Sequence, residues 1–424
     1  MKRYAYLLTT LCCFLILFLR GHERLGEYAH LWAEDGRIFL ADAFLSPLNT
    51  LFQSYGGYFH LVPRIVAVLA AQFVPVALIP SFIALFCFVV FALISATLIK
   101  TQYAWLIPSP HARFIAAILV TLAPGLHEIL GNLANLHILL FWWLALLALK
   151  DPKEPISKTE TLIAALSIAS EGSSVLLLPL FLYRIFLRRG KNQSLHRSAG
   201  PELIVCAITA AFTVFNLMYR NPGPEKHSYA FAETAQTLIA TTVGQHLVQP
   251  LLGYRAYENV MRFGYPYLAL SVGLFFGLFA VSQIRRKLPR RLLRLFILFE
   301  AIVFCQMVLT WIVRPGSIYY FFANGNTIWS HRYSFLRPAA GILVWLAALS
   351  PKKMTRNPKT WLPLIFAAAY CISVKGHFSI PAYGYHYKWK EQAPSIERSL
   401  KAGRKEKVVV PIYPPPWTFE LPYK

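Results

Sequence analysis

Glu34 and Asp35 stand side by side in the stretch "LWAEDGRIFLADAF", residues 31–44, directly after a hydrophobic N-terminal segment. The chain uses acids sparingly, with 19 Asp and Glu residues against 42 Lys and Arg residues. A carboxylate at the start of a helix has two common uses. It removes a proton from a substrate as a general base, or it accepts hydrogen bonds from the free amides of the first helical turn. Both uses remain open for Asp35, and Glu34 is interpreted as a charge at the helix entry.

Two further acids lie at the outer ends of short apolar segments. These are Glu128 in "APGLHEILGNLANLH" and Glu171 in "SIASEGSSVLLLP". A carboxylate near hydrocarbon is costly, so it usually faces a partner or a water-filled cavity. Both acids are therefore candidates for a substrate cavity, and for both the alternative is a salt bridge to an arginine of the same outside face.

Arginine and histidine residues recur in the loops on the side of the acidic pair. A group of them suits a phosphate, because the planar guanidinium offers two parallel donors to phosphate oxygens. Contact with lipid headgroups is the alternative for any single one. The residues are Arg37, His60, Arg64, Arg255, Arg262, Arg314, His331, Arg332 and Arg337.

The composition predicts an all-α polytopic membrane protein. Hydrophobic residues make up 56% of the 424 residues and charged residues 14%, against about 25% charged in an ordinary soluble domain. A helix crosses a hydrocarbon core of about 30 Å with about 20 residues. Apolar runs occur at 4–19, 76–99, 112–124, 135–149, 161–187, 201–219, 264–283, 295–313, 336–350 and 361–374.

The net charge of +23 does not indicate a nucleic-acid partner, because the basic residues collect in every second loop between the apolar runs. This alternation is the positive-inside pattern of membrane proteins. It holds throughout when the run 161–187 is divided into two short passes around "SEGSS", residues 170–174. The sequence then predicts about eleven transmembrane helices, with a cytoplasmic N-terminus, a retained first helix and an outside C-terminus.

The polar segments fall into a first outside loop, residues 20–60, and a C-terminal tail, residues 375–424. In the loop, "GRIFLADAFLSPL" has the apolar spacing of an amphipathic helix at the membrane interface, and a second such helix begins at His60 and stops at Pro75. We therefore expect a transmembrane domain over 1–374 and a separate tail. The six cysteines lie in apolar runs without metal-ligand spacing, so no cofactor is expected, while a divalent metal stays open.

Several motifs together resemble a known family. They are "WAEDGRIFL", "YGGYFHLVPR", "EILGNLANLH", "ASEGSSVLLLPLFLYR", "HRYSFLRP" and "VPIYPPPWTF". Their order resembles that in polytopic bacterial glycosyltransferases of the GT-C superfamily, near the phage-type serotype-converting O-antigen glucosyltransferases and related uncharacterised membrane proteins. The matches are short, but they are spread over nearly the whole chain.

The resemblance implies a GT-C-like enzyme of the bacterial inner membrane. It would move a sugar from a polyprenyl phosphate to a cell-envelope glycan on the periplasmic face, with membrane lipid as a further partner. An acid in the first outside loop is the base in that superfamily, and Asp35 matches its position, with Glu34 as a supporting neighbour. Direct displacement by one base would invert the sugar's configuration.

The resemblance also suggests residues for the two substrates. The arginine–tyrosine pair that precedes a late transmembrane helix in the family matches Arg332 and Tyr333, which implies contact with the donor phosphate. Arg64, His60 and Arg262 are further candidates for the donor phosphate, and Glu128, Glu171 and His331 for the acceptor cavity.

Two other functions fit part of the pattern. An O-antigen polymerase or ligase also uses outside arginines on a lipid-linked phosphate, but it typically relies on long loops late in the chain. A flippase or transporter should show paired repeats and charged residues near the middle of its spans. The early acidic pair favours the transferase.

Overall fold

The computed structural model describes residues 2–123, 126, 128–188, 195–218, 243–252, 266–313, 335–350, 361–374, 388–404 and 407–422. This part of the chain is mostly helical, as the composition predicts. Its strands form two antiparallel hairpins, β1 (Ser54–Tyr55) with β2 (Tyr58–Phe59) and β3 (Val408–Pro411) with β4 (Thr418–Leu421).

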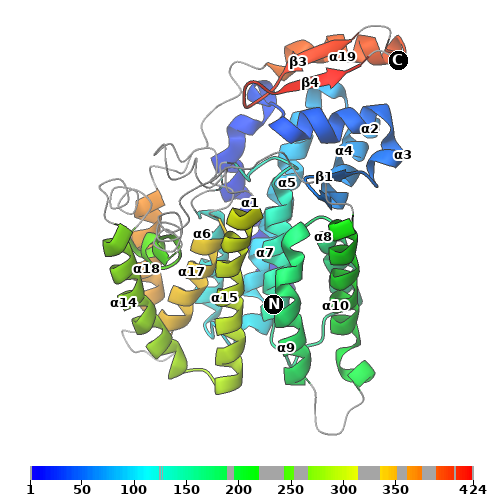
Figure 1. Cartoon of the computed structure of the whole chain (residues 1–424). Coiled ribbons are helices and arrows are strands. Elements are labelled where there is room, and N and C mark those ends of the chain that lie inside the picture. The colour runs from blue at the N-terminus through cyan, green and yellow to red at the C-terminus, as the bar shows by residue number, and fades with distance from the viewer. Residues whose placement is uncertain are drawn as a thin grey trace.

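Every predicted apolar run contains a helix, and these helices stand side by side as a bundle (Figure 1). Among the described residues, Tyr4–Arg24, Val76–Ile99 and Ala199–Met218 are long and apolar enough to cross a membrane. Helices of 11–14 residues span about 16–21 Å at 1.5 Å per residue, which is less than a bilayer core. The number of eleven crossings therefore stays a prediction. The bundle consists of α1 (Lys2–Gly21), α5 (Ile79–Ala96), α6 (Pro110–Thr121), α7 (Leu136–Leu149), α8 (Lys158–Ile168), α9 (Leu178–Arg188), α10 (Leu195–Met218), α14 (Pro266–Arg285), α15 (Arg290–Val313), α17 (Leu336–Leu349) and α18 (Leu362–Val374), with α12 (Gln249–Leu252) beside it.

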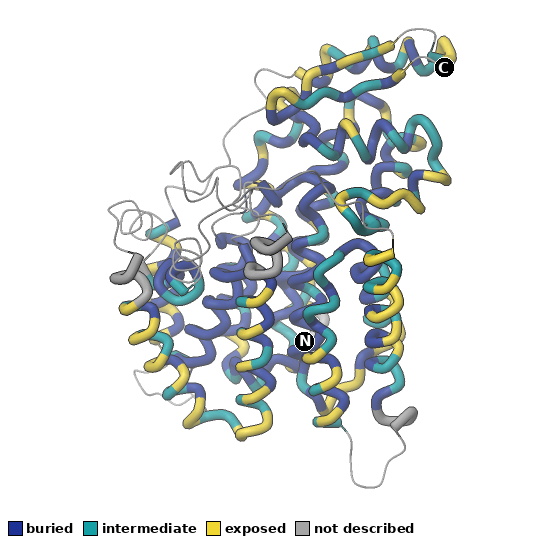
Figure 2. Tube along the Cα trace, viewed as in Figure 1, coloured by how far each residue is buried: buried dark blue, intermediate teal, exposed yellow. Residues whose placement is uncertain are grey.

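The outer flanks of the bundle carry large exposed apolar side chains. Figure 2 shows exposed segments along the outside of these helices and buried segments between them. A soluble protein rarely exposes so much contiguous apolar surface, so the flanks suit contact with lipid. Examples are Leu7, Leu15, Leu182, Phe186, Leu217, Phe275, Leu278, Ile365 and Ile372.

The chain reverses direction between α8 and α9, as the division of 161–187 predicts. A 3₁₀ helix over Gly172–Leu177 separates the two helices. Ser170 at this turn accepts a hydrogen bond from the amide of Val62, just after the first loop, whereas Arg184 near the end of α9 donates to the backbone of Lys150. The turn and Arg184 therefore lie toward opposite ends of the bundle.

One end of the bundle, called here the Asp35 end, is covered by a layer that joins the first loop to the C-terminal tail (Figure 1). The loop contributes a π-helix (Asp35–Leu40), α2 (Ala41–Leu45) and α3 (Pro47–Thr50), and α4 (Leu61–Phe73) follows it directly. The tail contributes α19 (Trp389–Lys401) and the β3–β4 hairpin. Trp389 donates its indole hydrogen to the carbonyl oxygen of Val76 at 2.7 Å and packs on Phe419. Helix α19 thus lies against the segment before α5, and β4 lies against the π-helix and α2.

The two helices expected at the membrane interface differ in their setting. The second, α4, ends two residues before Pro75, as predicted. The first is broken into the π-helix, α2 and α3, and its apolar face packs between α4 and β4. Phe39 is fully buried, and Phe44 packs on Phe419 at 6.3 Å between ring centroids. The apolar spacing therefore reflects contact with protein on this face.

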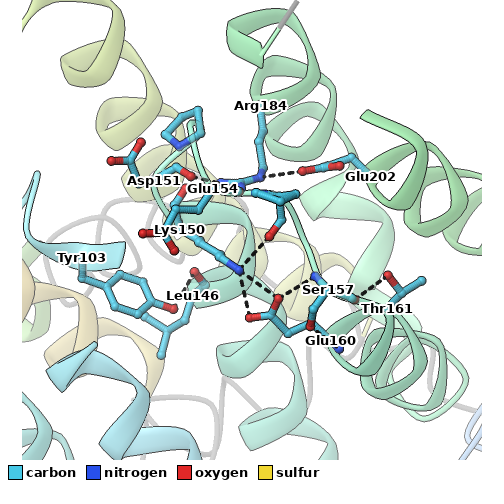
Figure 3. Close-up of polar contacts among 12 residues, drawn as sticks. Tyr103, Leu146, Lys150, Asp151, Glu154, Ser157, Glu160, Thr161, Arg184 and Glu202 are labelled. Carbon is cyan, nitrogen blue, oxygen red and sulfur yellow. Dashed lines mark hydrogen bonds and ion pairs between the residues drawn. The ribbon is translucent and has the colours of Figure 1, made fainter. Parts of the chain in front are cut away.

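The opposite end, called the Lys150 end, holds a network of charges around the turn between α7 and α8 (Figure 3). Lys150 binds both carboxylate oxygens of Glu160, at 2.9 and 3.1 Å, and Glu160 also accepts from the amide of Ser157, which caps α8. Arg184 pairs with Glu202 at 3.2 Å and donates to the carbonyl oxygens of Lys150, Asp151 and Glu154. The network stabilises the turn, because it neutralises buried charges and supplies hydrogen-bond donors to backbone carbonyl oxygens.

Replacing Arg184 with Met is expected to lower the free energy of unfolding by about 3–5 kcal/mol. It removes the closer of the two described arginine partners of the buried Glu202, and it removes hydrogen-bond donors from the turn. Lys388→Met is the control, since this side chain is 60% exposed and pairs with an exposed Glu391. Thermal and denaturant unfolding of the detergent-solubilised protein measures both. Equal stability of the two variants would contradict a structural role for the network.

Candidate functional site

Asp35 is fixed by the start of the segment that leads into α7. Its two carboxylate oxygens accept hydrogen bonds from the backbone amides of Leu133, at 2.9 Å, and Ala134, at 2.7 Å. The residue is 1% exposed. The contact joins the first loop to a segment almost a hundred residues further along the chain.

The sequence "GNLAN" shapes the segment that holds Asp35. Gly131 has a φ of +80°, a left-handed conformation that glycine adopts without strain. The Asn132 side chain accepts a hydrogen bond from the amide of Asn135 at 2.9 Å, and the amide groups of both asparagines donate to the carbonyl oxygen of Glu128. This tight turn directs the amides of residues 133 and 134 toward Asp35.

These contacts correct the helix-capping interpretation of Asp35. The π-helix that begins at Asp35 has no side-chain cap, and the carboxylate binds the distant amides instead. Capping looked possible because aspartate often precedes a helix in sequence. The long-range partner could not be read from the neighbouring residues.

The environment of Asp35 raises its affinity for a proton. Burial raises the pKa of Asp35 to about 7, although the hydrogen bonds from Leu133 and Ala134 act in the opposite direction. The negative charge of Glu34 adds a smaller upward effect, and the positive charge of Arg24 a smaller downward one. Asp35 is therefore a carboxyl group that gains and loses a proton near neutral pH.

Glu34 and Arg24 complete the surroundings of Asp35. Glu34 is partly buried, and its Oε2 atom has no hydrogen-bond partner among the described residues. Arg24 is 2% exposed, and its guanidinium lies over the Trp32 ring at 5.3 Å. Arg24 carries no distinguishing signal in the sequence, since "RGHERLGE" has the composition of a polar helix end.

The C-terminal tail covers the acidic pair. The backbone of Tyr413 accepts a hydrogen bond from the amide of Ala33 at 2.6 Å and donates one to the carbonyl oxygen of Leu31 at 3.2 Å. The Tyr413 ring packs on Trp32, and Ile412 lies against Gly36. The motif "VPIYPPPWTF" is thus part of the site's enclosure.

Arg64 and His60 lie beside the same π-helix, but their contacts differ from the predicted cluster. Arg64 is 1% exposed, forms an ion pair with Asp42 at 3.1 Å and donates to Thr50 at 2.5 Å. Its guanidinium also lies 5.3 Å from the Phe39 ring centroid. His60 is buried, and its ring centroid lies 5.2 Å from that of Phe39. Because Arg64 is buried, a donor phosphate could reach it only after the surrounding loop moves.

Glu171 and Glu128 are both buried. Glu171 pairs with His137 at 2.5 Å and accepts hydrogen bonds from the amide and hydroxyl groups of Ser173, so its partner is a histidine and not an arginine. Glu128 contributes its backbone carbonyl group to the turn that holds Asp35. The structure therefore connects both acids to the Asp35 end.

Six predicted site residues, Arg255, Arg262, Arg314, His331, Arg332 and Tyr333, lie outside the described residues. Arg337 is described and lies in α17, where its Nε atom donates to Gln245 at 2.6 Å. Over the described ranges, no group of three or more His, Cys, Asp or Glu side chains is placed to hold a metal. A shallow apolar pocket beside Trp105 and Lys287 lies near the Lys150 end and away from these residues.

Comparisons with protein-family models, with curated proteins and with solved structures found no match to this chain. The class of protein that the fold defines is a mostly helical bundle with apolar helices that could span a membrane.

The packing of Ile412 on Gly36 gives a test of the covering tail. A Cβ atom at position 36 would lie 2.6 Å from Cδ1 of Ile412, so Gly36→Ala should loosen the tail and cost about 1–3 kcal/mol. Limited proteolysis with a C-terminal tag should show faster cleavage of the tail.

Two further variants make this test specific. Adding Ile412→Val to Gly36→Ala removes the Cδ1 atom and should restore slow cleavage. Gly200→Ala is the control, because a Cβ atom there meets nothing within 4 Å. If the double variant is cleaved as fast as Gly36→Ala, the contact does not hold the tail.

Proposed function

We propose that the protein is a membrane glycosyltransferase that moves a sugar from a polyprenyl-phosphate donor to a cell-envelope glycan such as O-antigen. The environment of the Asp35 carboxyl group is the observation that best supports this function. It is a buried carboxyl group, held by two backbone amides, with a pKa raised to about 7 by burial. A general base works best when its pKa lies near the working pH.

The proposed reaction needs a base for the acceptor hydroxyl group and positive groups near the donor phosphate. Asp35 removes the proton from an acceptor hydroxyl group, the hydroxyl oxygen bonds to the sugar's anomeric carbon, and the bond from that carbon to the phosphate oxygen breaks. Polyprenyl phosphate leaves with the bonding electrons, so its oxygens gain negative charge. Positive groups nearby stabilise that charge. A single displacement of this kind inverts the anomeric configuration.

The positive charge for the phosphate comes from arginines in this proposal. Arg24 is the described guanidinium whose charge acts on Asp35. Arg332, with Tyr333, remains the candidate from the sequence, and Arg262 and Arg64 are alternatives. Because Asp35 is 1% exposed and Tyr413 lies nearby, the acceptor reaches the carboxylate only after the tail or the loop shifts.

The cellular setting is proposed from charge and shape together. Basic residues of the α7–α8 turn, such as Lys150 and Lys153, lie at the end of α7 that is opposite the segment holding Asp35. The positive-inside tendency would place that end in the cytoplasm and Asp35 on the periplasmic side.

Replacing Asp35 with Asn should reduce sugar transfer by a factor of about 100 or more, the usual scale for a lost base. Transfer from a radiolabelled polyprenyl-phosphate sugar to purified glycan measures the rate. The wild-type rate should rise with pH through about 7, because the base acts in its deprotonated form. A glycan carrying one added sugar would also distinguish a transferase from a polymerase, ligase or flippase.

Asp35→Asn also disturbs the loop, because the Asn amide group opposes one of the two backbone amides. Asn132→Ala is the matched control, since it loosens the same turn and keeps the carboxylate. It should retain the pH profile and most of the rate per folded molecule. Undiminished transfer by folded Asp35→Asn protein would end the assignment and direct attention to Glu34, Glu128 and Glu171.

A reporter that is active only in the periplasm should be active when fused after Lys424 and inactive when fused after Lys353. The physical reason is that Lys352 and Lys353 belong to a basic loop, whereas the tail packs on the loop of Asp35. The reverse pattern of activity would overturn the proposed orientation.

A further inference from the structure

A second group of polar and aromatic side chains lies at the Asp35 end, centred on His137 in the first turn of α7. The Nδ1 atom of His137 lies 2.5 Å from Oε2 of Glu171. Oε1 of Glu171 accepts from the Ser173 amide at 2.7 Å and from the Ser173 hydroxyl at 2.5 Å. Both oxygens of this buried carboxylate are therefore occupied.

These contacts determine which nitrogen of His137 is available. Burial acts to raise the pKa of Glu171, but His137 and Ser173 outweigh it and hold that pKa below its usual value. An ionised carboxylate only accepts hydrogen bonds, so the Nδ1 atom of His137 carries the hydrogen. The Nε2 atom is then the ring nitrogen that remains for a further partner, and 16% of the His137 side chain is accessible.

Aromatic rings frame His137 on the first-loop side. The rings of Tyr58 and His60 lie 5.6 and 5.8 Å from His137 between centroids, both roughly edge-on, and 4.2 Å from each other. Gly172 lets the Tyr58 ring approach the turn of Glu171, because a Cβ atom there would lie 3.0 Å from the ring. Aromatic walls with a few fixed polar atoms are typical of small-molecule sites.

The charges at this group select the kind of ligand. Glu171 places a negative charge directly behind His137, which disfavours a phosphate. The Nε2 atom either donates or accepts a hydrogen bond, and a hydroxyl group can form a bond of either kind. Sugar rings offer several hydroxyl groups around an apolar face that suits an aromatic ring.

We propose that His137, oriented by Glu171 and framed by Tyr58 and His60, is a binding site for a hydroxyl group of a sugar ring. The site is distinct from the base, but it is joined to it: residues 133 and 134 hold Asp35, and His137 follows three residues later. The inference rests on the proposed function, because a glycosyl transfer brings two sugars to this end, that of the acceptor glycan and that of the donor.

The His137→Asn variant distinguishes a role of His137 in ligand binding from a role in stabilising the fold. The Asn side-chain nitrogen takes the place of Nδ1 and still donates to Glu171, whereas nothing replaces Nε2. His137→Phe keeps a ring but loses both nitrogens, so it also breaks the tie to Glu171. His22→Asn is the control, since His22 is exposed in the same end layer.

Direct binding is tested first, by saturation-transfer NMR with the methyl glycosides of glucose, galactose, mannose and rhamnose. The wild type should transfer saturation to at least one of them, and His137→Asn should reduce the signal about fivefold or more, while His22→Asn leaves it unchanged. If no glycoside binds the wild type, or if only His137→Phe loses binding, the pair is structural and the inference is overturned.

Steady-state transfer then identifies the sugar. A rise of about five- to tenfold in the KM for the glycan, with the donor KM unchanged, assigns the site to the acceptor; the reverse assigns it to the donor sugar. A change confined to kcat, or none, overturns the inference while the transferase stands. Glycoside binding that depends on His137 in a protein without transfer activity would instead refute the proposed function and keep the site.

Discussion

The contact between the Asp35 carboxylate and the amides of Leu133 and Ala134 is the constraint on which the Asp35 end depends. A buried carboxylate is costly unless its oxygens are hydrogen-bonded, so the loop and the segment must keep this register. The segment in turn sets the start of α7 and thereby the position of His137. One interaction thus links the candidate base to the rings of Tyr58 and His60, although these residues lie far apart in the chain.

A second, independent constraint comes from the far end of the sequence. The backbone of Tyr413 forms hydrogen bonds with the residues just before the acidic pair. Trp389 donates a hydrogen bond to Val76 before α5 and packs on Phe419 of the tail. The first loop therefore lies between the segment before α7 and the C-terminal tail, and it forms hydrogen bonds with both. This enclosure excludes water from Asp35, and burial is the main cause of its raised pKa. The same enclosure makes movement of the tail a requirement for access.

Hydrophobic runs predicted the helices well because burial in a bundle or in lipid is a property of each segment's own residues. The reversal at Glu171 was likewise visible, since basic residues must alternate between loops. Side-chain partners could not be predicted in this way. The pairs of Asp35 with Leu133 and Ala134, of Arg64 with Asp42 and of His137 with Glu171 each join residues from different elements. Local spacing carries no signal for these pairs, so helix capping and catalysis both fit the sequence around Asp35, and nothing in the sequence distinguishes Arg24 or His137.

The two ends of the bundle treat buried charge differently, and this difference bears on where chemistry can occur. At the Lys150 end, Glu160 and Glu202 face cations directly. Burial acts to raise the pKa of Glu160, but Lys150 and the Ser157 amide outweigh it and hold that pKa below its usual value. Among the described residues, the hydrogen-bond partners of Asp35 are two backbone amides, and their orientation is fixed by the backbone of the "GNLAN" turn. Fixed dipoles stabilise the carboxylate less than an ion pair does, so burial brings its two protonation states close in free energy near neutral pH. A carboxyl group in that balance is able to accept a proton from a hydroxyl group and release it again.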